Sequence, residues 1–131
     1  MRKILLSTVV VFIVWAILGF LFHGILLKGL YDTAPVGLFR QMADMKMWLS
    51  YLVSLVLAGV FCSIYAYFIS EKSMKKGLYY GLFLGFGYGL GMGYGTYATM
   101  PLPYSLALCW FLITIFEYGV AGLLVGLIVK K

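Results

Sequence analysis

Apolar residues dominate four stretches of the chain, and short segments between them hold most of the charged and turn-forming residues. The stretches cover residues 4–27, 47–70, 77–98 and 104–129. Each has roughly 20 residues or more, the length that an α-helix needs to cross the hydrocarbon core of a bilayer. The pattern predicts an all-α fold, an integral membrane four-helix bundle in which residues 1–131 form a single four-span transmembrane domain.

The composition excludes an ordinary soluble domain. Hydrophobic residues make up 64% of the chain, charged residues only 11%, and the mean hydropathy is +1.04. A soluble domain of this size needs a polar surface that these residues cannot supply. The basic start followed by an apolar run resembles a signal peptide, but the run is too long and no small-residue cleavage site follows it. We therefore expect a retained first span.

The basic residues divide unevenly between the two ends of such a bundle. Four alternating spans place seven on one side: Arg2, Lys3, Lys72, Lys75, Lys76, Lys130 and Lys131. Three fall on the other side, beside two aspartates: Lys28, Arg40 and Lys46, with Asp32 and Asp44. The positive-inside rule then predicts that both termini are cytoplasmic. The same residues can contact anionic lipid head groups. No segment offers the folded basic face that nucleic-acid binding requires.

The third stretch is rich in glycine. One series recurs every four residues: Gly77, Gly81, Gly85, Gly89 and Gly93. A second series follows the same spacing: Gly87, Gly91 and Gly95. At about 100° per residue, neighbouring members of the two series lie about 200° apart around a helix. Because glycine faces let helix backbones approach closely, the pattern predicts a helix sandwiched between two neighbours.

Glu117 lies near the middle of the fourth stretch, and no stretch contains a Lys or Arg within it to pair with this acid. An ionisable group at that depth is costly, so it is usually buried, paired or used. Trp15 and Tyr88 fall at similar depth, and their N–H and O–H groups can donate to a carboxyl oxygen. Three interpretations remain open: a protonated acid hydrogen-bonded inside the bundle, a proton- or cation-coupled site, and a contact to another subunit.

His23, the single histidine, is expected near the outer end of the first span, facing protein. It can serve as a structural hydrogen-bonding group, a proton acceptor, or a ligand to a metal or haem. Several methionines also fall in the outer half, and thioethers with imidazole suit copper: Met42, Met45, Met47, Met92 and Met100. No compact ligand motif accompanies them, so we predict no metal and no cofactor.

Several short motifs carry a resemblance to known sequences: Phe22-His23-Gly24, Leu26-Leu27, Tyr31, Phe39-Arg40, Met45-Lys46-Met47-Trp48 and Pro101-Leu102-Pro103-Tyr104-Ser105-Leu106-Ala107. With the glycine-rich third span, they resemble an uncharacterised group of small bacterial four-span integral membrane proteins. The resemblance implies this topology and a bacterial inner, or cytoplasmic, membrane. It implies no activity and no site residues, because the group has none assigned.

The expected function follows from the glycine faces, from Glu117, and from the absence of any connection long enough to form a soluble domain. We expect a non-enzymatic membrane subunit that packs against other membrane helices, in a larger complex or a homo-oligomer. No catalytic constellation is visible, because the serines lie among apolar residues and only one histidine can act as a base. The alternative is a small proton- or cation-coupled transporter or channel that uses Glu117.

Overall fold

The computed structural model describes residues 1–40 and 42–130. Lys131, assigned above to the cytoplasmic side, lies outside the described residues, as does the side chain of Met42, one of the candidate copper ligands. The described residues contain helices, turns and coil but no strand, so the predicted all-α class is confirmed.

The long helices coincide closely with the predicted stretches. Helix α1 (Arg2–Gly19) continues into the π-helical segment η1 (Phe20–Leu26), and the short α2 (Lys28–Tyr31) follows. A single 3-10 turn, η2 (Met42–Asp44), precedes α3 (Met47–Phe68). Helix α4 (Met74–Leu90) runs on through the π-helical η3 (Gly91–Gly95) and α5 (Thr96–Thr99). The last helix is α6 (Tyr104–Ile128).

Three helices are long enough and apolar enough to cross a membrane: Arg2–Leu26, Met47–Phe68 and Tyr104–Ile128. The fourth helical run, residues 74–99, has a comparable length. Its many glycines and tyrosines make it less hydrophobic than the other three. The chain is therefore a membrane protein by the length and composition of three of its helices.

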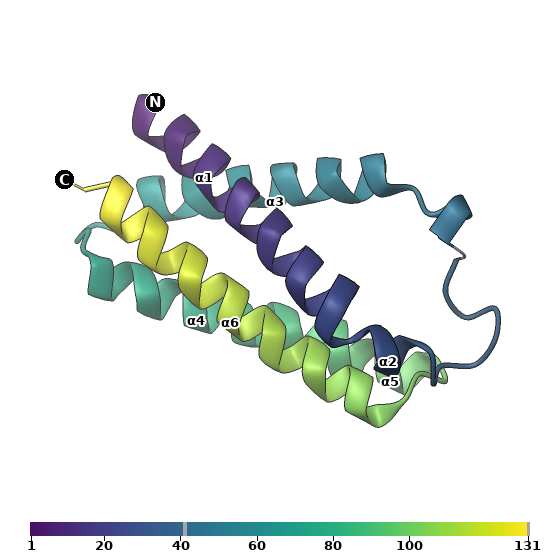
Figure 1. The fold of residues 1–131 in the computed structure, drawn as a ribbon. Coiled ribbons are helices and arrows are strands. Elements are labelled where there is room, and N and C mark those ends of the chain that lie inside the picture. Colours follow the sequence, from purple (N-terminus) through teal and green to yellow (C-terminus); the bar gives the residue numbers. More distant parts are fainter. Residues whose placement is uncertain (41, 131) are drawn as a thin grey trace.

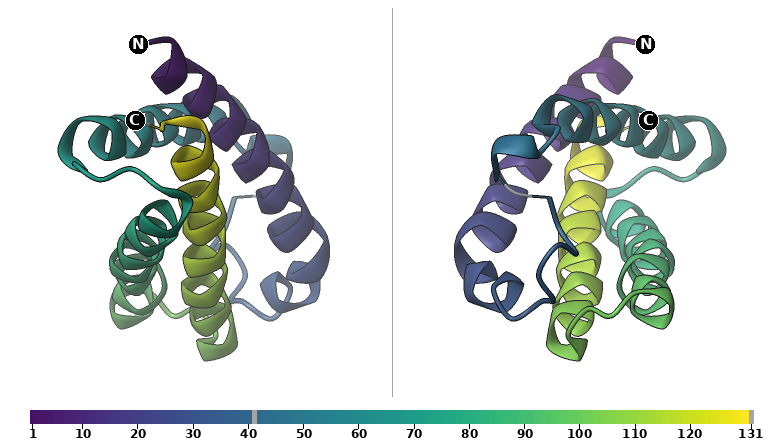
Figure 2. Two further views of the ribbon diagram at one scale, coloured as in Figure 1. Left: turned by 90° about the vertical axis from the view of Figure 1, so that its left-hand side faces the viewer. Right: turned by 90° about the vertical axis from the view of Figure 1, so that its right-hand side faces the viewer.

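The helices form a splayed bundle with distinct ends. Both termini and the α3–α4 connection lie at one end, while α2, α5 and the loop before α3 lie at the other (Figure 1). We call the first the basic end, after the residues it carries: Arg2, Lys3, Lys72, Lys75, Lys76 and Lys130. The opposite end is called the loop end. Helix α6 lies between α4 and α1, and α3 lies across them (Figure 2).

Helices α4 and α6 form an antiparallel hairpin with direct backbone contact. A Cβ added at Gly85 would lie 2.7 Å from Tyr118 Cβ, and one at Gly93 would lie 2.5 Å from the Ala107 carbonyl oxygen. Gly77 and Gly81 are closer still to carbonyl oxygens of α6. Because real Cβ atoms do not come this close, only glycine fits at these positions.

The second glycine series has a different environment. A Cβ added at Gly87, Gly91 or Gly95 would have nothing within 4 Å. The predicted sandwich of this helix between two neighbours is therefore not present within the described part of the chain. The reason is the splay of α3, whose buried residues lie only in its half nearer the basic end: Ala58, Phe61, Cys62 and Tyr65.

Hydrogen bonds organise the connection between α3 and α4. The Tyr65 hydroxyl donates to the Ser73 carbonyl over 2.9 Å and accepts from the Ser73 N–H over 3.1 Å. The Ser73 side chain accepts from the Lys76 N–H, which caps the start of α4. This connection therefore holds the basic-end half of α3 close to the α4–α6 hairpin.

The contrast between the two glycine series generates a stability prediction. An alanine at Gly81 would press its Cβ onto the Tyr118 carbonyl and to 3.0 Å from Gly122 Cα. We expect Gly81→Ala to lower the free energy of unfolding by about 1–3 kcal/mol, the usual cost of overpacking. Unfolding of the dilute detergent-solubilised monomer, followed by circular dichroism against added SDS, measures it.

The matched control is Gly87→Ala, in the same helix. Alanine has open space there and a helix propensity up to about 1 kcal/mol better than glycine, so stability should stay equal or rise. Equal losses in the two variants would contradict the hairpin packing.

Candidate functional site

An aromatic stack joins three helices near the middle of the bundle. The Trp15 ring of α1 stacks on Tyr118 of α6, with ring centroids 4.9 Å apart and planes 23° apart. Tyr88 of α4 stacks at 5.5 Å and 19° on Tyr118. The aromatic stack (Trp15, Tyr118, Tyr88) therefore places two of the predicted site residues beside the α6 residue that follows Glu117.

Trp15 reaches Glu117 through the backbone. Its indole N–H donates to the Glu117 carbonyl oxygen over 2.9 Å, and not to the carboxyl group. The Glu117 side chain is half-buried, and within residues 1–40 and 42–130 it has no hydrogen bond or ion pair. The indole bond ties α1 to α6 at this level and leaves the carboxyl group available for another partner.

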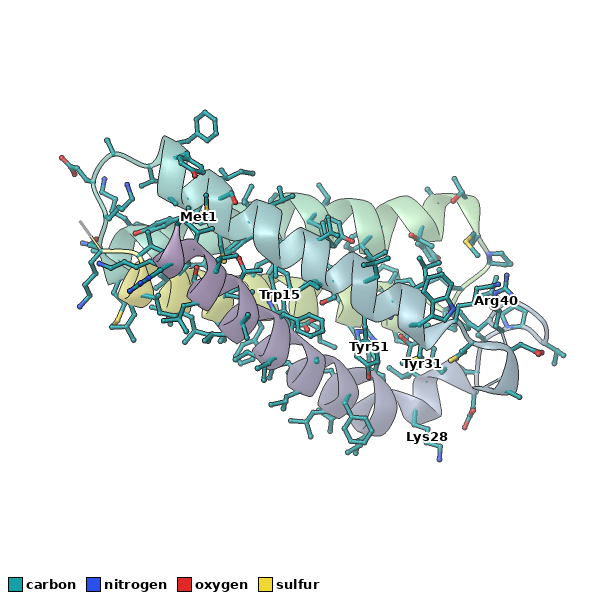
Figure 3. All side chains as sticks on the ribbon, turned by 90° about the horizontal axis from the view of Figure 1, so that it is seen from above. Met1, Trp15, Lys28, Tyr31, Arg40 and Tyr51 are labelled. Atoms are coloured by element: carbon teal, nitrogen blue, oxygen red, sulfur yellow. The ribbon has the colours of Figure 1, made fainter. Side chains whose placement is uncertain are left out.

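A second group of aromatic residues attaches α3 to the same region. Phe61 lies edge-on to Trp15 at 5.7 Å and to Tyr118 at 5.5 Å. Tyr80 of α4 packs on Phe61 at 4.7 Å, and its hydroxyl donates to the Phe61 carbonyl. These contacts hold α3 at the depth of Phe61, while toward the loop end the Tyr51 ring lies edge-on to Phe12 of α1, with ring centroids 6.4 Å apart. Trp15 and Tyr51 lie between the α1 and α3 ribbons in Figure 3.

His23 belongs to a separate cluster at the loop end. The Tyr31 hydroxyl lies 2.7 Å from His23 Nδ1 and accepts from the Trp110 indole N–H over 2.8 Å. The indole can only donate, so the phenol proton is free to point at Nδ1 when a neutral His23 carries its ring proton on Nε2. The Phe39 ring packs edge-on to Tyr31 at 5.2 Å. We call these four residues the histidine cluster (His23, Tyr31, Phe39, Trp110).

Tyr31 is the centre of the histidine cluster. It lies in α2, beyond the first span, and it is half-buried. Burial raises the pKa of its phenol, and the hydrogen bond from Trp110 opposes that rise. On balance the pKa of Tyr31 is raised, so its hydroxyl stays protonated at any physiological pH. Tyr31 therefore acts as a fixed polar link between the end of the first span and α6.

The predicted intramembrane site is thus divided. Trp15 and Tyr88 lie with Tyr118, next to Glu117, whereas His23 lies in the histidine cluster. The sequence pattern alone did not indicate Tyr118 or Trp110 as members of these sites. Tyr118 could have been chosen because it directly follows the acid in the middle of the fourth stretch. Trp110 could have been chosen because it is a tryptophan near the end of that stretch.

The metal interpretation of His23 finds no partner set in the described residues. No group of three His, Cys, Asp or Glu residues there could hold a metal ion. His23 Nδ1 is occupied by Tyr31. The candidate thioethers whose side chains are described are all exposed: Met45, Met47, Met92 and Met100.

Comparison with known proteins adds no relative. No protein-family model, curated protein sequence or solved structure matches this chain.

The histidine cluster generates a second stability prediction. Tyr31→Phe removes the hydroxyl that serves both His23 and Trp110 and leaves two half-buried polar groups without a partner. We expect a loss of about 1–3 kcal/mol in unfolding free energy, the usual cost of unsatisfied buried groups. A lowered thermal midpoint of the purified protein in detergent, followed by tryptophan fluorescence, would show it.

Tyr51→Phe is the control, because Tyr51 is 46% exposed and its hydroxyl makes no hydrogen bond within the described residues. Equal midpoints for the wild type and Tyr31→Phe would refute the linking role of Tyr31.

Proposed function

We propose that this chain is a non-enzymatic integral membrane subunit that packs against other membrane helices, in a larger complex or a homo-oligomer. The proposal includes four spans in a bacterial cytoplasmic membrane, with residues 74–99 as the glycine-rich third span. Residues 74–99 lie along α6, and α6 is long and apolar enough to cross a membrane. As the hairpin partner of α6, residues 74–99 would then lie at the same depth. The basic end then faces the cytoplasm, following the positive-inside rule.

The open glycine series is the observation that carries the proposal. Gly87, Gly91 and Gly95 form a stripe of about two helical turns, and within the described residues no packed neighbour lies within 4 Å of the added Cβ positions. Each glycine costs helix propensity, up to about 1 kcal/mol relative to alanine. If these glycines face acyl chains, nothing offsets this cost. If they face a second helix, the missing side chains permit close backbone approach.

The apolar surface of α3 supports the same proposal. From Met47 to Val56, nearer the loop end, the large apolar side chains are all 40% or more exposed: Met47, Trp48, Leu49, Tyr51, Leu52, Val53, Leu55 and Val56. Only 17% of the most apolar 18-residue stretch of α3 is buried inside the chain. A helix of this kind offers a continuous surface either to lipid or to another membrane helix.

A leucine on the open stripe tests this function. Gly91→Leu places a bulky side chain in open space within the monomer, so folding should be preserved. In the membrane assembly the same side chain would separate two helix backbones. We expect the native mass of the gently solubilised assembly to fall to that of the monomer, or the co-purifying subunit to be lost.

The matched control is Gly19→Leu on α1, where an added Cβ also has nothing within 4 Å. It should leave the assembly intact. A stable lone monomer for the wild type would overturn the proposal, and equal loss with both variants would overturn the assignment of the contact to the α4 stripe.

A second candidate function is favoured by one observation, the half-buried Glu117 carboxyl group without a partner in the described residues. An acid in this setting can carry a proton or bind a cation during transport. In proteoliposomes, Glu117→Gln should then abolish proton-coupled flux while the circular dichroism spectrum stays unchanged. Flux that survives the substitution, or no flux for any substrate, rejects this candidate.

A further inference from the structure

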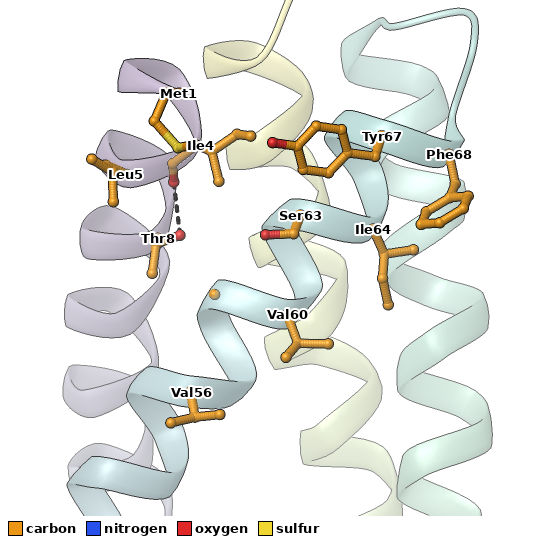
Figure 4. A pocket seen from close by; sticks show the side chains of 11 residues that line it. Met1, Ile4, Leu5, Thr8, Val56, Val60, Ser63, Ile64, Tyr67 and Phe68 are labelled. Atoms are coloured by element: carbon orange, nitrogen blue, oxygen red, sulfur yellow. Dashed lines mark hydrogen bonds between the residues drawn. The ribbon is translucent and has the colours of Figure 1, made fainter.

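An apolar groove lies between α1 and α3 at the basic end, away from the aromatic stack and the histidine cluster. Its volume is about 500 Å³, within the range of about 300–1,000 Å³ typical of small-molecule sites. Figure 4 shows its lining residues, which come from the start of α1 and from residues 56–68 of α3. The floor includes Ile4, Thr8, Gly59 and Ser63, which are half-buried.

The floor of the groove is mostly apolar, and the hydroxyl of Thr8 is turned to the backbone. The Thr8 hydroxyl donates to the Ile4 carbonyl over 2.7 Å, so its polar group is already satisfied (Figure 4). The Thr8 methyl carbon Cγ2 lies 3.7 Å from the position a Cβ would take at Gly59. The missing side chain of Gly59 therefore leaves open the space between the helices.

The dimensions match half of a bilayer. On α3 the lining extends from Val56 to Phe68, a length of about 18 Å at about 1.5 Å rise per residue. One leaflet contributes about half of the ~30 Å hydrocarbon core. Along α3 the groove is thus about as long as one leaflet is thick, which is the length of a single acyl chain.

Charge at the mouth selects the lipid class. Arg2 and Lys3 lie in the first turn of α1, between the lining residues Met1 and Ile4 in sequence; both are exposed, and neither is itself part of the lining. The only ion pair within residues 1–40 and 42–130 joins Lys76 to Glu71, so these two cations have no acidic partner there. Basic side chains at this level attract anionic head groups, by about 1 kcal/mol each near a charged surface.

We propose that this groove holds one acyl chain of an anionic phospholipid whose head group meets Arg2 and Lys3. A second protein helix fits less well, because the rim carries large exposed side chains and Gly59 is the single glycine of the lining. The rim residues are Met1, Leu5, Val56, Val60, Ile64, Tyr67 and Phe68. This lipid site is independent of the α4 stripe, so either proposal can fail without the other.

Native mass spectrometry of the full chain in nonionic detergent tests the site, with phosphatidylglycerol and phosphatidylcholine titrated separately at low lipid-to-protein ratio. The wild type should retain one phosphatidylglycerol and prefer it to phosphatidylcholine. Gly59→Leu fills the groove and should weaken retention of both lipids by about tenfold or more. Gly19→Leu, the same change in open space on α1, should retain phosphatidylglycerol as the wild type does.

Two further variants keep the test decisive if Gly59→Leu fails to fold. Ser63→Leu fills the groove one turn further along α3 and should weaken lipid retention in the same way. The double variant Arg2→Gln with Lys3→Gln should abolish the preference for phosphatidylglycerol while the acyl chain still binds.

Three results would overturn the proposal: no lipid preference in the wild type, undiminished retention in the filled variants, or equal loss in Gly19→Leu. A change of oligomeric mass in Gly59→Leu without a change in lipid retention would mean that a helix occupies the groove instead.

Discussion

Backbone contact between α4 and α6 is the constraint on which the rest of the structure depends. Gly77, Gly81, Gly85 and Gly93 bring α4 so close to α6 that any added Cβ would meet α6 atoms at 2.7 Å or less. At this separation Tyr88 can stack on Tyr118. With Tyr118 held on one face by Tyr88, its other face is presented to Trp15, and α1 docks there.

The attachment of α3 follows from the same arrangement and is limited by it. Phe61, Tyr65 and Tyr80 bring α3 to the hairpin only at its basic-end half, where the short connection through Ser73 also holds it. Beyond Ala58, toward the loop end, α3 has no buried residue. One cause therefore explains both the open glycine stripe on α4 and the exposed apolar side of α3. In a bilayer these surfaces must meet lipid or another helix.

Glu117 and His23 lie at two different levels of the bundle, so they do not form one polar site. Glu117 stands beside an aromatic stack that supplies an indole bond to its carbonyl but no donor to its carboxyl group. His23 is already engaged by Tyr31, and Tyr31 by Trp110. The histidine cluster is thus a satisfied structural link, while Glu117 keeps its hydrogen-bonding capacity for a partner, a proton or a cation.

Sequence alone determined the helical class, the positions of the long helices and the two glycine series, because these depend on local composition and on a period that a single helix repeats. It also indicated Glu117, Trp15, Tyr88 and His23 as unusual polar or aromatic positions. Only the tertiary structure decided which glycine series is packed, that His23 lies apart from Glu117, and that Trp15 bonds a carbonyl instead of the acid. These outcomes depend on how four helices cross, and crossing is set by side-chain fit between segments up to about a hundred residues apart, such as Trp15 and Glu117.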